Sequence, residues 1–158
     1  MLSIPTQTVS AGAVRVSGTL DPDDKVWLEG DEQPTSPGIT VAGRVSAAGA
    51  GRFYFSGTFA GHATQECRRC LCDVDVAITS DVHVLFADGD HSDADDPDVY
   101  PLAQGRNGPE VDLRPAIREE WLLDIPAFVL CTPDCKGLCP TCGANLNLGA
   151  CDCARQTE

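Results

Sequence analysis

A chain of 158 residues with 42% hydrophobic residues is long enough to fill one modest core. No stretch approaches the roughly 20 apolar residues that cross a bilayer, and residues 1–6 lack the basic and apolar parts of a secretory signal. We therefore expect a cytoplasmic protein with no membrane contact. The net charge of −13, from 24 acidic and 11 basic side chains, repels polyanions at long range and argues against indiscriminate nucleic-acid binding.

The first half of the chain predicts an antiparallel β structure. Residues 1–12 are mainly small and polar, and we expect them to fray. Apolar and polar residues then alternate, as is typical of strands with one buried face. Strands are expected over residues 13–18, 26–28, 39–45, 52–59 and 74–86, with a further strand running toward Cys67. The glycine-containing residues 46–51 provide a hairpin connection.

An acidic segment follows these strands. Residues 88–98 are rich in aspartate and poor in apolar residues, which is typical of a solvated loop. The aspartates also suggest a calcium loop, but the ligand spacing and the terminal glutamate of an EF-hand are absent. The solvated loop is therefore the favoured interpretation.

One helix is predicted, over about residues 112–125. Its apolar residues recur at three- and four-residue spacing, which gives one face to pack on the sheet: Leu113, Ile117 and Trp121. Asp112 is the expected N-cap and Pro126 ends the helix. The predicted fold is α+β, with a mainly antiparallel, sandwich- or barrel-like β-sheet and one packed helix. Residues 1–130 form this core, and residues 131–158 form a zinc-ribbon-like tail.

The nine cysteines fall in two clusters, three within residues 67–72 and six within residues 131–153. A reducing cytosol and an odd count do not suit a disulfide framework. Short spacings direct two thiolates to one ion, and Gly143 after Cys142 lets the backbone turn so that amides donate to sulfur. We expect two zinc ions, each held by four of these ligands: Cys67, Cys70, Cys131, Cys135, Cys139, Cys142, Cys151 and Cys153. Cys72 is left over, as a small half-buried residue.

Two partitions of the ligands remain open. Proximity in sequence favours a compact site made of Cys139, Cys142, Cys151 and Cys153. The other four would then join the predicted sheet to the tail and close a loop of about sixty residues. In the opposite partition, Cys67 and Cys70 meet Cys151 and Cys153. A redox role for Cys67 and Cys70 would need a helix N-terminus to lower a thiol pKa, whereas their flanks predict strands.

Sequence signals of catalysis are missing. The chain contains no phosphate loop, dinucleotide fingerprint or nucleophile elbow, and its three histidines are scattered. A four-cysteine zinc site has no open coordination position for a substrate. We therefore expect a protein that is not an enzyme and has no small-molecule substrate.

With these residues in view, the chain resembles the YceD family, the large ribosomal RNA subunit accumulation proteins. The resemblance rests on Glu66-Cys67-Arg68-Arg69-Cys70-Leu71, on the acidic loop and on Val111-Asp112-Leu113 at the start of the helix. It rests above all on Cys131, on Cys135-Lys136-Gly137-Leu138-Cys139-Pro140 and Cys142-Gly143-Ala144-Asn145-Leu146-Asn147, and on Cys151 and Cys153. These features cover roughly residues 60–153.

The resemblance implies a role in 23S ribosomal RNA accumulation and large-subunit biogenesis, with precursor 23S rRNA or large-subunit ribosomal proteins as partners. Arg68, Arg69 and Lys136 flank the cysteines and are the candidate contacts with RNA or a partner. Equally, Arg68 and Arg69 could balance the charge of the thiolates. The alternatives are an acidic adaptor that holds a basic ribosomal protein or a partner enzyme, and a thiol redox sensor.

Overall fold

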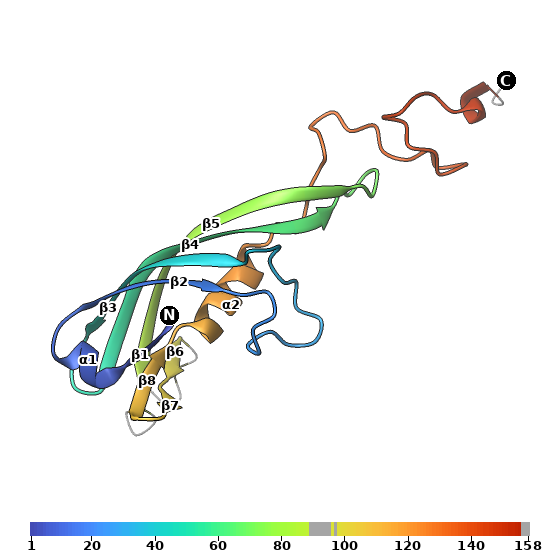
Figure 1. Ribbon diagram of the computed structural model, residues 1–158. Coiled ribbons are helices and arrows are strands. Elements are labelled where there is room, and N and C mark those ends of the chain that lie inside the picture. Colours follow the sequence, from blue (N-terminus) through green and yellow to red (C-terminus); the bar gives the residue numbers. More distant parts are fainter. Residues whose placement is uncertain (89–95, 97, 156–158) are drawn as a thin grey trace. The chain divides into compact units, whose positions relative to one another are not determined.

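The computed structural model describes residues 1–88, 96 and 98–155, and the chain divides into two units (Figure 1). Unit 1 comprises Met1–Ala63 and Ala77–Ile125, and unit 2 comprises Thr64–Val76 and Pro126–Glu158. The sequence placed the start of the tail at residue 131. In the structure, the second unit starts earlier and also takes in the segment around Cys67. Most of the predicted acidic loop, residues 89–95 and 97, lies outside the described residues.

The chain is mostly β structure with few helices. The strands are β1 (Ser3–Pro5), β2 (Val14–Leu20), β3 (Ile39–Ala47), β4 (Arg52–Glu66), β5 (Asp73–Ala87), β6 (Val99–Pro101), β7 (Ala103–Gly105) and β8 (Gly108–Asp112). The helical segments are α1 (Thr6–Ser10), α2 (Arg114–Asp124) and the 3-10 turn η1 (Asp152–Arg155). No helix in the described part of the chain is long and apolar enough to span a membrane.

The strands form one sheet of order β2-β3-β4-β5-β6 and a smaller one of order β1-β8-β7. β3 pairs antiparallel with β4, so that Val41 lies opposite Phe59 and Val45 opposite Phe55. All four side chains are buried, which confirms that the alternation in these strands marks one inward face. The larger sheet is mixed, because β6 joins β5 in parallel.

The predicted helix is present as α2, and Trp121 is its largest buried side chain. The indole ring lies 6.1 Å from the ring of Phe59 on β4, measured between centroids. A Cβ atom added to Gly61, also on β4, would lie 2.9 Å from the indole. Gly61 therefore leaves the space that the indole occupies, and the helix packs close to the strand.

The N-cap of the helix lies one residue later than predicted. Leu113 holds the N-cap position with helical backbone angles and makes no capping hydrogen bond through its side chain. Asp112 lies one residue before the cap, and its carboxylate accepts the Arg114 N–H at 3.1 Å. Asp112 was correctly predicted to bind a backbone N–H at the start of the helix, but it lies one residue before the N-cap position.

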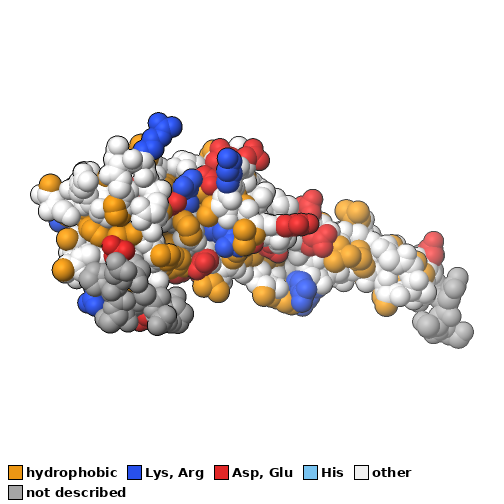
Figure 2. Space-filling view, turned by 90° about the horizontal axis from the view of Figure 1, so that it is seen from below, with side chains coloured by type: hydrophobic (Ala, Val, Ile, Leu, Met, Phe, Trp, Pro, Cys, Tyr) orange, Lys and Arg blue, Asp and Glu red, His pale blue; other side chains and the backbone are white. Residues whose placement is uncertain are grey.

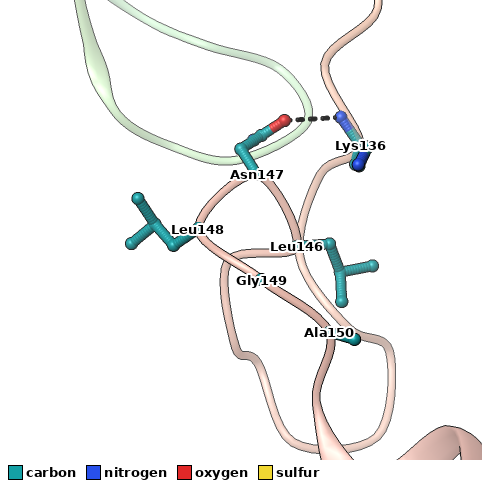
Figure 3. A pocket seen from close by; sticks show the side chains of 6 residues that line it. All are labelled: Lys136, Leu146, Asn147, Leu148, Gly149 and Ala150. Carbon is teal, nitrogen blue, oxygen red and sulfur yellow. Dashed lines mark hydrogen bonds between the residues drawn. The ribbon is translucent and has the colours of Figure 1, made fainter.

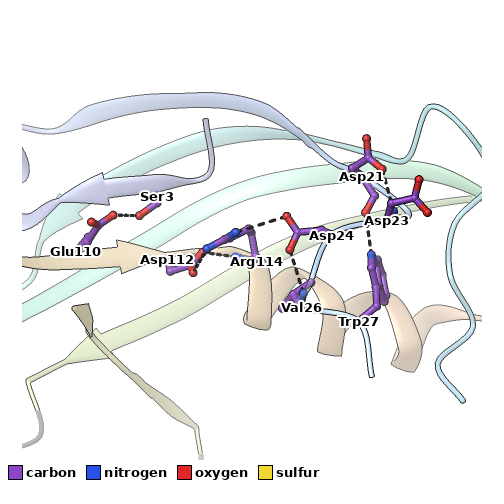
Figure 4. A network of polar contacts seen from close by, with 9 residues as sticks. All are labelled: Ser3, Asp21, Asp23, Asp24, Val26, Trp27, Glu110, Asp112 and Arg114. Carbon is purple, nitrogen blue, oxygen red and sulfur yellow. Dashed lines mark hydrogen bonds and ion pairs between the residues drawn. The ribbon is translucent and has the colours of Figure 1, made fainter. Parts of the chain in front are cut away.

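The predicted strand over residues 26–28 is wrong, because aspartates take up its backbone amides (Figure 4). Asp24 accepts the Val26 N–H at 2.9 Å, and Asp31 accepts the Leu28 N–H at 2.7 Å. Trp27 donates its ring N–H to the carbonyl of Asp21 at 2.8 Å. Side-chain hydrogen bonds of this kind compete with strand pairing and favour turns.

Two ion pairs attach this loop to α2. Arg118 donates to both carboxylate oxygens of Asp31, at 2.5 and 3.0 Å. This hydrogen bond is the main reason why the pKa of Asp31 lies below its usual value. Arg114 contacts Asp112 at 2.7 Å and Asp24 at 3.5 Å (Figure 4).

The expectation that residues 1–12 fray is also wrong. Ile4 on β1 pairs with Val111 on β8, and the Leu113 N–H donates to the carbonyl of Leu2 at 2.9 Å. Leu2, Ile4 and Val9 are all buried. A few apolar residues in a polar segment were enough to anchor it, because they meet a partner strand more than one hundred residues away in sequence.

Candidate metal centre

Unit 2 has almost no apolar core apart from sulfur. All of its buried hydrophobic residues, within the described range, are cysteines: Cys67, Cys70, Cys135 and Cys139. Val74, Leu130 and Leu138 pack against them only partly buried. All nine cysteines are free thiols. The packing of this unit therefore centres on its sulfur atoms.

The thiols form two groups of four that could each hold a metal ion. One group comprises Cys67, Cys70, Cys72 and Cys131, and the other comprises Cys139, Cys142, Cys151 and Cys153. Within each group, the sulfur atoms lie within 4.8 Å of one another. The structure therefore places Cys67 and Cys70 beside Cys131 and away from the Cys151–Cys153 pair.

The first group is built on a tight turn between β4 and β5. The Leu71 N–H donates to the carbonyl of Cys67 at 2.9 Å, and the Cys67 N–H donates to the carbonyl of Cys72 at 2.8 Å. The amides of Cys70 and Arg69 point at the sulfur of Cys67 and, against the effect of burial, lower the pKa of this thiol to about 5. The turn therefore stabilises a thiolate without any cation.

The second group repeats this turn. The Gly143 N–H donates to the carbonyl of Cys139 at 2.9 Å, as the Leu71 N–H does to Cys67. The amides of Cys142 and Thr141 lower the pKa of Cys139 to about 6. Gly143 has a φ of 73° and Leu71 a φ of 59°, so both turns need a residue in the left-handed region after the second cysteine. The two turns therefore share one backbone geometry, as their common spacing of cysteines suggested.

The distances between sulfur atoms suit a metal ion with tetrahedral coordination. With Zn–S bonds of about 2.3 Å, the edges of a four-sulfur tetrahedron are about 3.8 Å. Cys67 lies 3.8 Å from Cys135 and Cys70 lies 3.5 Å from Cys131, sulfur to sulfur. The separation between Cys70 and Cys72 is 3.3 Å. Cys135 therefore lies beside the first group, at the ideal separation from Cys67.

The thiol pKa values indicate a donor set that needs a cation. Whereas the pKa values of Cys67 and Cys139 are lowered, those of Cys72, Cys131, Cys151 and Cys153 are raised, mainly by hydrogen bonds between thiols. Cys135 is the main cause of the raised pKa of Cys131, and Cys142 is the main reason why the pKa of Cys153 rises to about 12. Thiolates this close repel one another, so a divalent cation is what would let all four ionise together. The residues present therefore fit a metal ion such as zinc.

Asn147 supports this centre, although the sequence analysis assigned it no role. Its side-chain oxygen accepts the Lys136 N–H at 2.8 Å (Figure 3). Its amide nitrogen then lies 3.3 Å from the sulfur of Cys135. The same nitrogen lies 2.8 Å from the side-chain oxygen of Asn145. Asn147 is one of six residues that line a pocket, with Lys136, Leu146, Leu148, Gly149 and Ala150. The only sequence signal was its place at the end of the string after Cys142.

The three candidate contact residues lie around the first turn with exposed side chains. Arg69 donates to the carbonyl of Cys135 at 2.9 Å, and its own carbonyl accepts the Leu138 N–H at 3.1 Å. The backbone of Arg68 donates to Val129 at 2.9 Å. Arg69 thus holds the two halves of unit 2 together, directly beside Lys136.

Comparison with known proteins places the chain in a family. The sequence model of the family described as "Large ribosomal RNA subunit accumulation protein YceD" matches residues 55–158. A maize relative, named as the chloroplastic homolog 1 of the large ribosomal RNA subunit accumulation protein YCED, is 44% identical over 68 residues. These residues are 42% of this chain and 22% of the relative. The Arabidopsis thaliana homolog of the same name is 45% identical over 49 residues, 31% of this chain and 15% of that protein.

A Mycobacterium tuberculosis protein named as uncharacterized is 37% identical over 92 residues, 58% of this chain and 44% of its own length. The chain thus spans less than half the length of these relatives. No solved structure matches it. The family match covers about two thirds of the chain, including both cysteine groups. The chain therefore belongs to the YceD family of large ribosomal RNA subunit accumulation proteins.

Proposed function

We propose that this chain is a non-catalytic, zinc-binding factor that supports 23S rRNA accumulation and large ribosomal subunit biogenesis in the cytoplasm. The observation that carries the proposal is the pair of four-thiol groups inside the family match. Free thiols at metal-ligand separations belong in a reducing compartment. The tail is then a zinc-ribbon-like module whose ions replace the apolar core it lacks.

Zinc is favoured among metals by the donor set. Four thiolates in a tetrahedron suit zinc or an iron–sulfur cluster, and knuckle turns with amide-to-sulfur bonds suit single zinc ions. A closed site of this kind supplies folding free energy rather than a reactive position. This is the support for a non-catalytic role.

The charge of the two units differs, which bears on the partners. Unit 1 carries 18 acidic and 7 basic side chains, a net charge of −11, whereas unit 2 carries 6 and 4, a net charge of −2. On the face in Figure 2, acidic side chains are interspersed with lysines and arginines. An RNA contact therefore suits unit 2, where Arg68 and Lys136 are exposed.

A combined knockdown and rescue experiment tests the proposal. Depleting the protein should lower mature 23S rRNA and cause large-subunit precursors to accumulate, and the wild-type chain should restore both. Rescue should fail for Cys67→Ala/Cys70→Ala, because the first metal site is lost. Normal 23S rRNA after complete depletion would overturn the role in accumulation.

The contact residues can be separated from the metal ligands. Arg68→Ala/Lys136→Ala should keep two zinc ions, yet bind purified precursor rRNA more weakly and with a smaller salt dependence. Arg69→Ala is the structural comparison, because it removes the hydrogen bond to Cys135. Unchanged RNA binding by Arg68→Ala/Lys136→Ala would remove these residues from the proposal.

The second candidate is an acidic adaptor for a basic ribosomal protein, which the net charge of unit 1 favours. It predicts that the purified chain binds a basic large-subunit protein but no free rRNA. Association with rRNA in the absence of proteins would favour the first candidate.

A further inference from the structure

The first metal centre holds five thiols for four coordination positions. Cys72 belongs to the group of four whose sulfur atoms are mutually close, and Cys135 does not. Yet Cys135 lies 3.8 Å from Cys67, which is the edge of a four-sulfur zinc site. Two residues are therefore candidates for one position, while Cys67, Cys70 and Cys131 are common to both sets.

Cys72 is placed by the turn itself. Its carbonyl accepts the Cys67 N–H at 2.8 Å, and its sulfur lies 3.3 Å from that of Cys70. The left-handed Leu71 between them turns the chain so that both side chains face the same point. The second centre uses the same one-residue spacing, because Cys151 and Cys153 both belong to its group. A pair spaced in this way can therefore supply two ligands to one ion.

Cys135 is placed by its surroundings. Asn147 donates a side-chain N–H toward its sulfur, and Arg69 donates to its carbonyl. Cys135 is buried, whereas Cys72 is half-buried. Hydrogen bonds to sulfur are typical of ligands held in a metal site, which makes Cys135 the ligand of the resting state.

From these contacts, we propose that Cys72 is a reserve ligand that replaces Cys135 in the first zinc site. The inference rests on the zinc sites of the proposed function. In the exchange, the bond from zinc to the Cys135 sulfur breaks and a bond to the Cys72 sulfur forms. The thiol proton of Cys72 passes to the Cys135 sulfur, and no electrons are transferred. The second site has no such reserve, because the other five of the nine cysteines all lie at the first site.

The test compares alanine variants at the two sites. The first-site variants are Cys135→Ala, Cys72→Ala and the double variant, and Cys153→Ala is the matched control in the site without a reserve. Zinc per chain is measured by native mass spectrometry, and zinc affinity is measured by chelator competition. Cobalt substitution gives a second readout, because the sulfur-to-cobalt charge-transfer band grows with the number of bound thiolates. Tryptophan fluorescence checks that unit 1, which contains both tryptophans, stays folded.

We expect both first-site single variants to keep two zinc ions and the full charge-transfer band. The double variant and Cys153→Ala should each lose affinity at one site by about a hundredfold or more, the upper end of what outer-shell changes alone produce. If Cys135→Ala alone weakens binding as much as the double variant, Cys72 is no reserve. If Cys72→Ala alone does so, Cys72 is a permanent ligand and the inference is equally wrong. A wild-type chain without zinc would instead overturn the proposed sites, and the inference with them.

Discussion

Metal removal should unfold unit 2 and leave unit 1 folded. The buried hydrophobic residues of unit 2, within the described range, are four cysteines, whereas unit 1 buries large side chains such as Trp121, Phe55 and Phe59. Structural zinc contributes about 10–16 kcal/mol per site in small zinc domains. A whole domain is stable by only about 5–15 kcal/mol. When both ions are removed, unit 2 has no other interaction that contributes a comparable free energy.

Amide hydrogen exchange, followed by mass spectrometry with and without a chelator, measures this directly. The amides of Leu138, Cys139 and Leu146 are hydrogen-bonded inside unit 2 and should lose their protection when the metal leaves. Peptides from β2, β3 and α2 should keep theirs. The fluorescence of Trp27 and Trp121 should stay constant, because both belong to unit 1.

Adding zinc back should restore protection in unit 2, which controls for damage by the chelator. Two results would refute the reasoning. If unit 2 stays protected after mass spectrometry shows complete metal loss, its thiols and partly buried side chains suffice to fold it. If unit 1 opens together with unit 2, the two are one cooperative body rather than two.

Three further changes test single contacts. Gly61→Ala should lower the free energy of unfolding in urea by about 1–3 kcal/mol, because its Cβ would crowd the indole of Trp121; an unchanged midpoint would mean that the ring moves freely. Leu71→Gly should raise zinc affinity by up to about 1 kcal/mol, because it relieves a left-handed backbone while the exposed side chain loses little burial; weaker binding in chelator competition would contradict this. Asp31→Asn should destabilise the protein at neutral pH and have less effect in acid. Because the pKa of Asp31 is lowered in the folded protein, the ion pair with Arg118 stabilises the protein at pH values above the unfolded-state pKa of about 3.9. This stabilisation is lost as the pH falls through the pKa of Asp31 in the folded state. If the difference in urea midpoint between Asp31→Asn and the wild type does not change with pH, the ion pair is not the cause of the destabilisation.

Local patterns predicted the parts of this fold that local forces determine. Alternation located β3 and β5, and three-to-four spacing located α2 around Trp121. The pairing of β1 with β8 joins residues more than one hundred positions apart, so nothing near Ile4 could indicate it. Residues 26–28 were mistaken for a strand because their run of apolar side chains does not show that Asp24 and Asp31 bind backbone amides.

The cysteine spacings predicted which residues gather, but not their full arrangement. Cys72 was set aside because it has no partner at the usual spacing, and its position depends on the backbone angles of Leu71, which sequence does not reveal. Asn147 was missed because its hydrogen bond to Cys135 spans a turn that exists only in the folded unit. In both cases the missing information is the path of the backbone, not the chemistry of the residue.

The two turns show how the same geometry is reached by different means. The second turn has glycine at the left-handed position, and in the described part of the chain it is flanked by the isolated bridge between Leu138 and Asn145 rather than by strands. The first has Leu71 there, a residue that costs about 1–2 kcal/mol in that conformation and persists only where its surroundings determine it. Those surroundings are the ends of β4 at Glu66 and β5 at Asp73, joined by the Cys67 N–H to the Cys72 carbonyl. The first turn is therefore held by its strands as well as by its sulfur atoms, which is why leucine is tolerated there and why Cys72 joins the other thiols of the first group.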